Sequence, residues 1–175
     1  MVFNVSWFVH FLLYYICWIA CIYYAAHQEP YKGPLITLCL FSVQLLWQLI
    51  HQKPCLKPLY FALGLMVLGG ITDTFWLRSG LIYFTANPFG SSASPLWMLC
   101  LWLSFGFYVT VNTEYWLHYY TIWGFLSLIF IPMAYWLGAL PGAMVLQQGY
   151  LFYLYLGITW FFLMPLCLYL YNMIK

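Results

Sequence analysis

The sequence has very few charged side chains. Only 5% of its 175 residues are charged, with five Lys and Arg against three Asp and Glu. A water-soluble domain carries about 25% charged residues, so this chain cannot cover a surface that faces water on all sides. The few basic residues form no cluster, which excludes a nucleic-acid-binding surface. Three carboxylates are also too few for a di-metal carboxylate centre.

The sequence also lacks the short motifs of common catalytic sites. It contains no Gly-rich phosphate loop, no nucleophile elbow and no zinc signature. Six cysteines are present, but none form a Cys-x-x-Cys pair, and all except Cys55 lie in apolar runs, where cysteine behaves as a small hydrophobe. We therefore expect no metal and no cofactor. The sequence contains no unambiguous nucleophile or acid–base pair, so it leaves open whether the protein is an enzyme.

The sequence is rich in long apolar segments. Hydrophobic residues make up 66% of the chain, and their runs are close to the 20 or so residues that cross a bilayer as a helix. Segments punctuated by Pro, Gly and charges separate these runs. We predict an all-α fold, a polytopic transmembrane helical bundle of about six helices in a single membrane domain over residues 1–175. The helices are expected at about 3–26, 34–51, 59–77, 95–113, 120–140 and 148–173.

Proline marks the start of three of these helices. Pro34, Pro58 and Pro95 are each followed by Leu, and proline is tolerated in the first turn because its missing N–H has no partner there. The longest connection follows the third helix. Its apolar segment Leu81–Phe84 is too short to span, so it either re-enters the bilayer or lies along the interface.

Aromatic side chains are abundant, at 24% of the residues. Trp and Tyr favour the headgroup level of a bilayer, yet five tyrosines fall in the middle of predicted spans. These five are expected to find partners inside the bundle or to line a cavity: Tyr14, Tyr15, Tyr135, Tyr153 and Tyr155. A cavity for an apolar or prenyl-like ligand is one interpretation, and aromatic packing between helices and lipid is the favoured one.

Asp73 is the main candidate functional residue. A carboxylate near the middle of a spanning helix costs about 2.5–3.5 kcal/mol on insertion scales, so it is rarely present without a role. Gly69 and Gly70 lie on the same helical stripe and allow another group to approach it closely. Arg78 follows five residues later, about 140° around the helix. We expect Arg78 to reach the headgroups rather than Asp73.

Other polar candidates gather near the opposite membrane edge. At about 1.5 Å per residue, His10 and Gln48 lie about 10 Å from that edge and Asn112 about 4 Å, with Glu114 just beyond. Asn112 is therefore too far from Asp73 to share its partners. This group is either a site that opens to the cytoplasm or, as we favour, interhelical hydrogen bonding. Haem ligation by His10 and His51 is disfavoured because their heights differ.

Short motifs in the middle of the chain are similar to those of a known family. They are Gly70-x-x-Asp73, Gly80-x-x-x-Phe84, Pro95-Leu96-Trp97 with Leu101-Trp102, and Asn112. The chain resembles a family of small, uncharacterised bacterial inner-membrane proteins known only as a domain of unknown function, over most of its length and most strongly from Leu63 to Asn112. Members are often encoded near lipid-modification genes, such as those for cyclopropane-type fatty acid synthases. The resemblance implies a role around membrane lipids and no catalytic residues.

Orientation follows from the Lys and Arg residues outside the spans. If both termini are cytoplasmic, Lys53, Lys57 and Lys175 lie inside, while Lys32 and Arg78 lie outside. Positive residues favour the cytoplasmic side, so the count of three against two favours N-in and C-in in the bacterial inner membrane.

Two function classes stay open beside the leading hypothesis. The leading hypothesis is an accessory or lipid-handling factor in membrane-lipid metabolism or envelope stress, with membrane lipids as partners. The first alternative is a small transporter in which Asp73 is a coupling site. The second is a structural partner of another membrane protein in a complex.

Overall fold

The computed structural model describes residues 5–112 and 117–173, and this part of the chain is folded into six α helices and one short sheet. The elements are α1 (Val5–Ala26), α2 (Lys32–Ile50), α3 (Leu56–Arg78), β1 (Ile82–Phe84), α4 (Leu96–Asn112), α5 (Tyr120–Ala139), β2 (Met144–Leu146) and α6 (Tyr150–Met173). The prediction of an all-α bundle of six helices is confirmed.

The helices have the length and composition of membrane spans. Five of them, all but α4, are long and apolar enough to cross a bilayer. Their outer faces carry large exposed hydrophobic residues, such as Ile19, Leu35, Ile71, Ile129 and Phe162. On helices of this length and composition, an exposed apolar surface of this extent marks contact with a membrane. The protein is therefore a multi-pass membrane protein.

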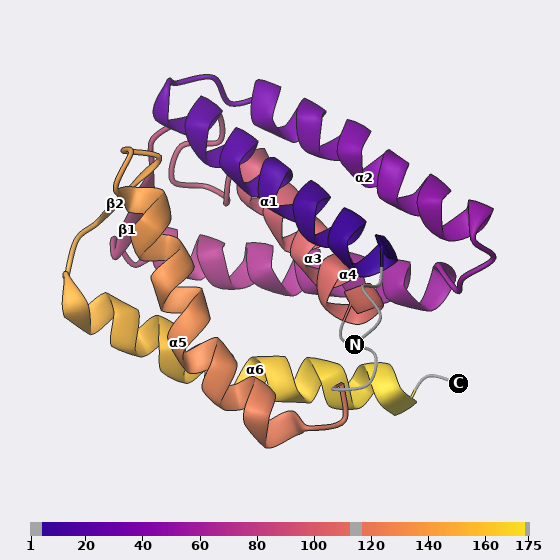
Figure 1. Ribbon diagram of the computed structural model, residues 1–175. Helices are drawn as coiled ribbons and strands as arrows, with labels where there is room; N and C mark the ends of the chain where they lie inside the picture. The colour runs from indigo at the N-terminus through magenta and orange to yellow at the C-terminus, as the bar shows by residue number, and fades with distance from the viewer. Residues whose placement is uncertain (1–4, 113–116, 174–175) are drawn as a thin grey trace.

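The six helices pair as three consecutive hairpins. Helices α1 and α2 pack together, as do α3 with α4 and α5 with α6. Helix α4 also contacts α1 and α2, and α6 contacts α3. Figure 1 shows that α1 begins and α6 ends at the same end of the bundle. Helix α4 is central, and eleven of its 17 residues are buried.

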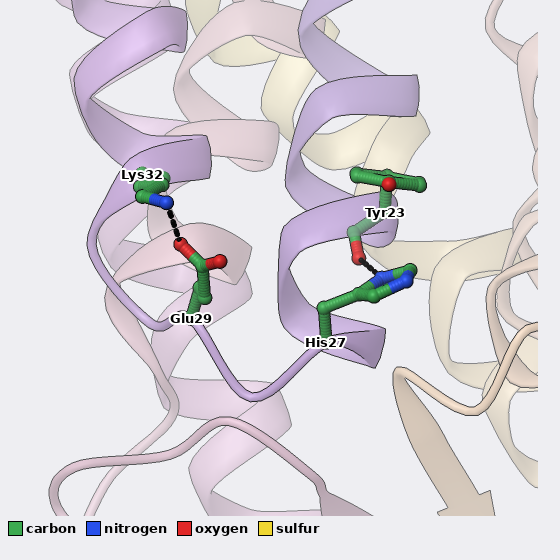
Figure 2. Close-up of polar contacts among 4 residues, drawn as sticks. All are labelled: Tyr23, His27, Glu29 and Lys32. Carbon is green, nitrogen blue, oxygen red and sulfur yellow. Dashed lines mark hydrogen bonds and ion pairs between the residues drawn. The ribbon is translucent and has the colours of Figure 1, made fainter.

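Polar contacts close the turn between α1 and α2. Lys32 forms an ion pair with Glu29, and His27 donates from Nδ1 to the carbonyl oxygen of Tyr23 at 2.8 Å (Figure 2). Gln28 has a positive φ of 63°, which reverses the chain after α1. These side chains lie at the end of the bundle where polar groups can meet the headgroups and water.

Several predicted boundaries are corrected by the structure. Helix α2 begins at Lys32 rather than residue 34, and α3 at Leu56 rather than residue 59, so Pro34 and Pro58 occupy the third helical position instead of the first. The first helical turn has no internal N–H bonds to lose, so proline fits at either place. The predicted start of the first helix at residue 3 lies outside the described residues.

The segment Leu81–Phe84 contains a β strand. Within it, β1 pairs antiparallel with β2, with Tyr83 opposite Val145. The sequence pattern predicts no strand at β2, because three residues are too few for a periodic signal. The sheet joins the connection after α3 to the connection after α5 at one end of the bundle.

Candidate functional site

Asp73 lies in the centre of a buried polar cluster. It belongs to α3 and has no exposed surface. Trp102 of α4 donates from Nε1 to Asp73 Oδ2 at 2.8 Å, and the Tyr135 hydroxyl of α5 donates to Asp73 Oδ1. Both carboxylate oxygens therefore have a donor from a different helix. A buried carboxylate is tolerated in this setting because these bonds replace those to water.

Glycine at position 69 makes the contact with Trp102 possible. A Cβ atom built at Gly69 would overlap the ring atoms Cγ, Cδ1 and Cδ2 of Trp102. The indole therefore lies directly against the α3 backbone, one turn before Asp73. From this position its N–H group reaches the carboxylate. The expectation that the glycine stripe lets another group approach Asp73 matches this geometry.

Aromatic rings surround the hydrogen-bonded side chains. The ring of Trp102 stacks on Trp160 of α6 with centroids 4.3 Å apart and planes at 20°. Tyr135 and Trp76 both contact Phe152 of α6. Trp102 and Tyr135 are 5% and 4% exposed, so packing fixes both donors in orientation. The cluster therefore connects α3, α4, α5 and α6.

An apolar groove lies beside this cluster, between α1, α4 and α5. We call it the α1/α4/α5 groove, and its volume is about 390 Å³. Its lining includes Tyr14, Tyr15 and Trp18 of α1, Trp102 and Phe105 of α4, and Phe130, Ala134 and Tyr135 of α5. Trp102 and Tyr135 thus contact Asp73 and also form part of the groove wall. Asp73 lies behind them and does not line the groove.

Arg78 lies apart from Asp73, at the last residue of α3. Its guanidinium donates from Nε and Nη2 to the carbonyl oxygen of Ser92, at 3.1 and 2.7 Å. The helix is continuous up to Arg78, and both Asp73 oxygens already accept bonds from Trp102 and Tyr135. The two charged candidates on α3 therefore have separate surroundings.

The remaining candidates lie at the other end of the bundle. His10 and Gln48 are buried on α1 and α2, and neither ring nitrogen of His10 nor Oε1 of Gln48 has a hydrogen-bond partner among the described residues. Asn112, at the end of α4, donates from Nδ2 to the carbonyl oxygen of Trp7 at 3.2 Å. Glu114 lies outside the described residues. Among the described residues, Asp73 and Arg78 form their side-chain hydrogen bonds with Trp102, Tyr135 and Ser92, and not with these candidates.

Histidine and cysteine positions do not form a metal site in the part of the chain that the structure describes. No group of three or more His, Cys, Asp or Glu side chains comes together there. His10 is 1% exposed, whereas His51 is exposed at the end of α2 and bonds through Nδ1 to the carbonyl oxygen of Trp47. This pair therefore does not face a common haem pocket.

Sequence reasoning did not identify Trp102 and Tyr135 as partners of Asp73. The helical rise does place these residues at a similar depth in the bilayer. Asp73 lies about 22 Å from Pro58, and Tyr135 lies about 22 Å from Tyr120 on a helix that runs in the same direction. Trp102 lies about 10 Å from Pro95 on an antiparallel helix, which is nearly the same level. Depth alone could not choose between these and other aromatic residues, because it does not specify which helices are neighbours.

The chain matches the model of a known family. A family described as protein of unknown function (DUF2878) matches residues 7–166. This confirms the resemblance to a family of unknown function. Curated proteins and solved structures give no match.

Proposed function

We propose that this chain, which belongs to the DUF2878 family, is a lipid-handling membrane protein that binds a hydrocarbon chain in the α1/α4/α5 groove. The observation that carries the proposal is the groove itself. Its volume of about 390 Å³ is within the range of about 300–1,000 Å³ that is typical of ligand sites. Its aromatic and aliphatic walls suit an acyl or isoprenoid chain.

The position of the groove supports a lipid as its ligand. Both α1 and α5 are membrane-spanning helices, and rim residues of the groove on them are substantially exposed. Tyr15 is 45% exposed, Phe130 52% and Met133 41%. These side chains face the hydrocarbon region of the bilayer. The molecules with direct access to such a groove are membrane lipids.

The Asp73 cluster supplies rigidity to one wall of the groove. Two residues of this wall, Trp102 and Tyr135, donate hydrogen bonds to the Asp73 carboxylate. A groove whose wall is already ordered loses less conformational entropy when a chain binds. In this proposal Asp73 is a positioning residue, and it does not contact the lipid.

The alternative of a transporter coupled through Asp73 has less support. A coupling carboxylate must exchange a proton or cation with water on at least one side of the membrane. Asp73 has no exposed surface, and both of its oxygens accept hydrogen bonds from Trp102 and Tyr135. An ion could reach the carboxylate only after these bonds break.

The proposal is tested by filling the groove and measuring retained lipid. Ala134→Trp adds bulk inside the groove, and Ile129→Trp adds the same bulk on the lipid-facing side of α5, where Ile129 is 60% exposed. We expect Ala134→Trp to lose lipid that copurifies with the parent protein in detergent, and Ile129→Trp to retain it. Equal lipid content in the two variants would contradict the proposal.

A second test uses cells. The fatty-acyl and phospholipid profile of a strain that lacks the gene is compared with that of its parent. A changed profile that the parent gene restores, and Ala134→Trp does not, supports lipid handling through this groove. An unchanged profile contradicts a role in lipid metabolism.

A further inference from the structure

We propose that Arg78 and the groove beside it bind an anionic phospholipid, with the phosphate at Arg78 and an acyl chain along α3. This site is separate from the α1/α4/α5 groove. Its volume is about 660 Å³, and residues of α3, α4 and the connection between them line it. We call it the α3/α4 groove.

Arg78 provides a positive charge at one end of the α3/α4 groove. The side chain is exposed, and it has no ion pair within residues 5–112 and 117–173. Two of its N–H groups are used by the carbonyl oxygen of Ser92, which fixes the guanidinium. A guanidinium has five N–H donors, so three are left for a phosphate. A fixed guanidinium matches phosphate geometry better than a mobile one.

A buried hydroxyl lines the same groove. Ser94 is 2% exposed, and its Oγ has no hydrogen-bond partner in the part of the chain that the structure describes. Its backbone N–H donates a hydrogen bond to the Thr74 hydroxyl of α3 at 3.0 Å. Helix α4 begins two residues later, so its N-terminal dipole also favours a negative group here. Arg78, Ser94 and this helix end therefore favour an anion.

The length of the groove fits a lipid within one leaflet. Along α3 the lining runs from Met66 to Arg78, which is about 18 Å at 1.5 Å per residue. Half of a hydrocarbon core of about 30 Å is only slightly shorter. Apart from Thr74, the α3 and α4 side chains that line the groove before Arg78 are apolar, with Val67, Ile71 and Leu99 among them. A headgroup at Arg78 therefore places an acyl chain against apolar side chains.

The proposed ligand is a phospholipid whose phosphate charge is not neutralised by an amine in its own headgroup, and phosphatidylglycerol is the probe. Its binding to the purified full-length protein is measured by native mass spectrometry beside that of a diacylglycerol with the same chains. Arg78→Gln removes the charge but keeps an amide that can donate to Ser92. Lys32→Gln is the control, because Lys32 is another exposed cation, already paired with Glu29.

We expect Arg78→Gln to bind phosphatidylglycerol about five to ten times more weakly, with diacylglycerol binding unchanged. Lys32→Gln should bind both lipids as the parent does. Unchanged phosphatidylglycerol binding in Arg78→Gln, or an equal loss in Lys32→Gln, would overturn the proposal. So would full competition by millimolar inorganic phosphate, because the site would then recognise a free anion instead of a lipid.

Val67→Trp keeps the proposal testable if Arg78→Gln is not recovered as a folded protein. Val67 is 54% exposed at the far end of the groove, so tryptophan there blocks the acyl chain and leaves Arg78 intact. We expect weaker binding of both lipids, and unchanged binding would contradict the proposed path of the chain. Ala134→Trp should leave the Arg78-dependent binding unchanged, which separates failure of this site from failure of the α1/α4/α5 groove.

Discussion

Trp102 donates to Asp73 across the interface of α3 and α4, and the same indole ring stacks on Trp160 of α6. The Trp102 side chain therefore forms a hydrogen bond within the α3–α4 hairpin and an aromatic contact with the α5–α6 hairpin. Tyr135 completes the connection, since it bonds the same carboxylate from α5. The α5–α6 hairpin is thus attached to the rest of the bundle partly through a single buried carboxylate.

Replacing Asp73 by Leu should destabilise the fold much more than replacing it by Asn. Leu leaves the N–H of Trp102 and the O–H of Tyr135 buried without acceptors, at about 1–3 kcal/mol for each unsatisfied group. Asn can accept from Trp102 and donate to the Tyr135 oxygen, so we expect a loss near 1 kcal/mol. The free energy of unfolding in mixed micelles measures both. Equal losses would show that the charge, and not the hydrogen bonding, stabilises the cluster.

Tyr135→Phe should be destabilising in the parent but not beside Asp73→Leu. In the parent it removes a donor from the carboxylate, which we expect to lower the free energy of unfolding by about 1–2 kcal/mol. With Leu at position 73 the hydroxyl has no acceptor there, so its removal should be neutral or stabilising. A double-mutant cycle measures this coupling. Tyr83→Phe, at an exposed tyrosine of β1, is the control, and additive effects would contradict the geometry.

Gly69→Ala and Gly64→Ala form a matched pair on α3. A Cβ at position 69 overlaps the ring of Trp102, whereas a Cβ at position 64 meets no atom within 4 Å. Overpacking typically costs about 1–3 kcal/mol, while Gly to Ala in an open helical position gains about 0.5–1 kcal/mol. The melting temperature of Gly69→Ala should therefore be below that of the parent, and the melting temperature of Gly64→Ala should be equal to it or higher. The reverse order would exclude the close contact between Trp102 and α3.

The C-terminus should lie in the cytoplasm. Lys53, Lys57 and Lys175 outnumber Lys32 and Arg78 by three to two, and such residues favour the cytoplasmic side. A reporter that is active only in the periplasm, fused after Lys175, should be silent, and a cytoplasmic reporter at the same place should be active. The opposite pattern would mean that the whole bundle is inverted. Inversion would also place Arg78 in the cytoplasmic leaflet.

The class of fold and most of the helices can be predicted from the order of residues alone. Long apolar runs interrupted by Pro, Gly and charge leave little alternative to spanning helices, because a bilayer requires backbone groups to bond within each segment. That order also identifies Asp73, since a carboxylate in such a run is conspicuous on energetic grounds. The glycines before Asp73 indicated a close contact there. These signals are local, so they can be read without knowing which helices touch.

The contacts between distant segments could not be predicted in this way and come from the three-dimensional fold. It placed Trp102 and Tyr135 on the two oxygens of Asp73, paired β1 with β2, and formed the α1/α4/α5 groove. Asp73 and Tyr135 are 62 residues apart, and many aromatic residues lie at a similar depth in the bundle. In lipid, apolar helix faces are not distinguished by the hydrophobic effect, and close packing and hydrogen bonds select which faces meet. That selection depends on three-dimensional shape, which the order of residues along one helix does not specify.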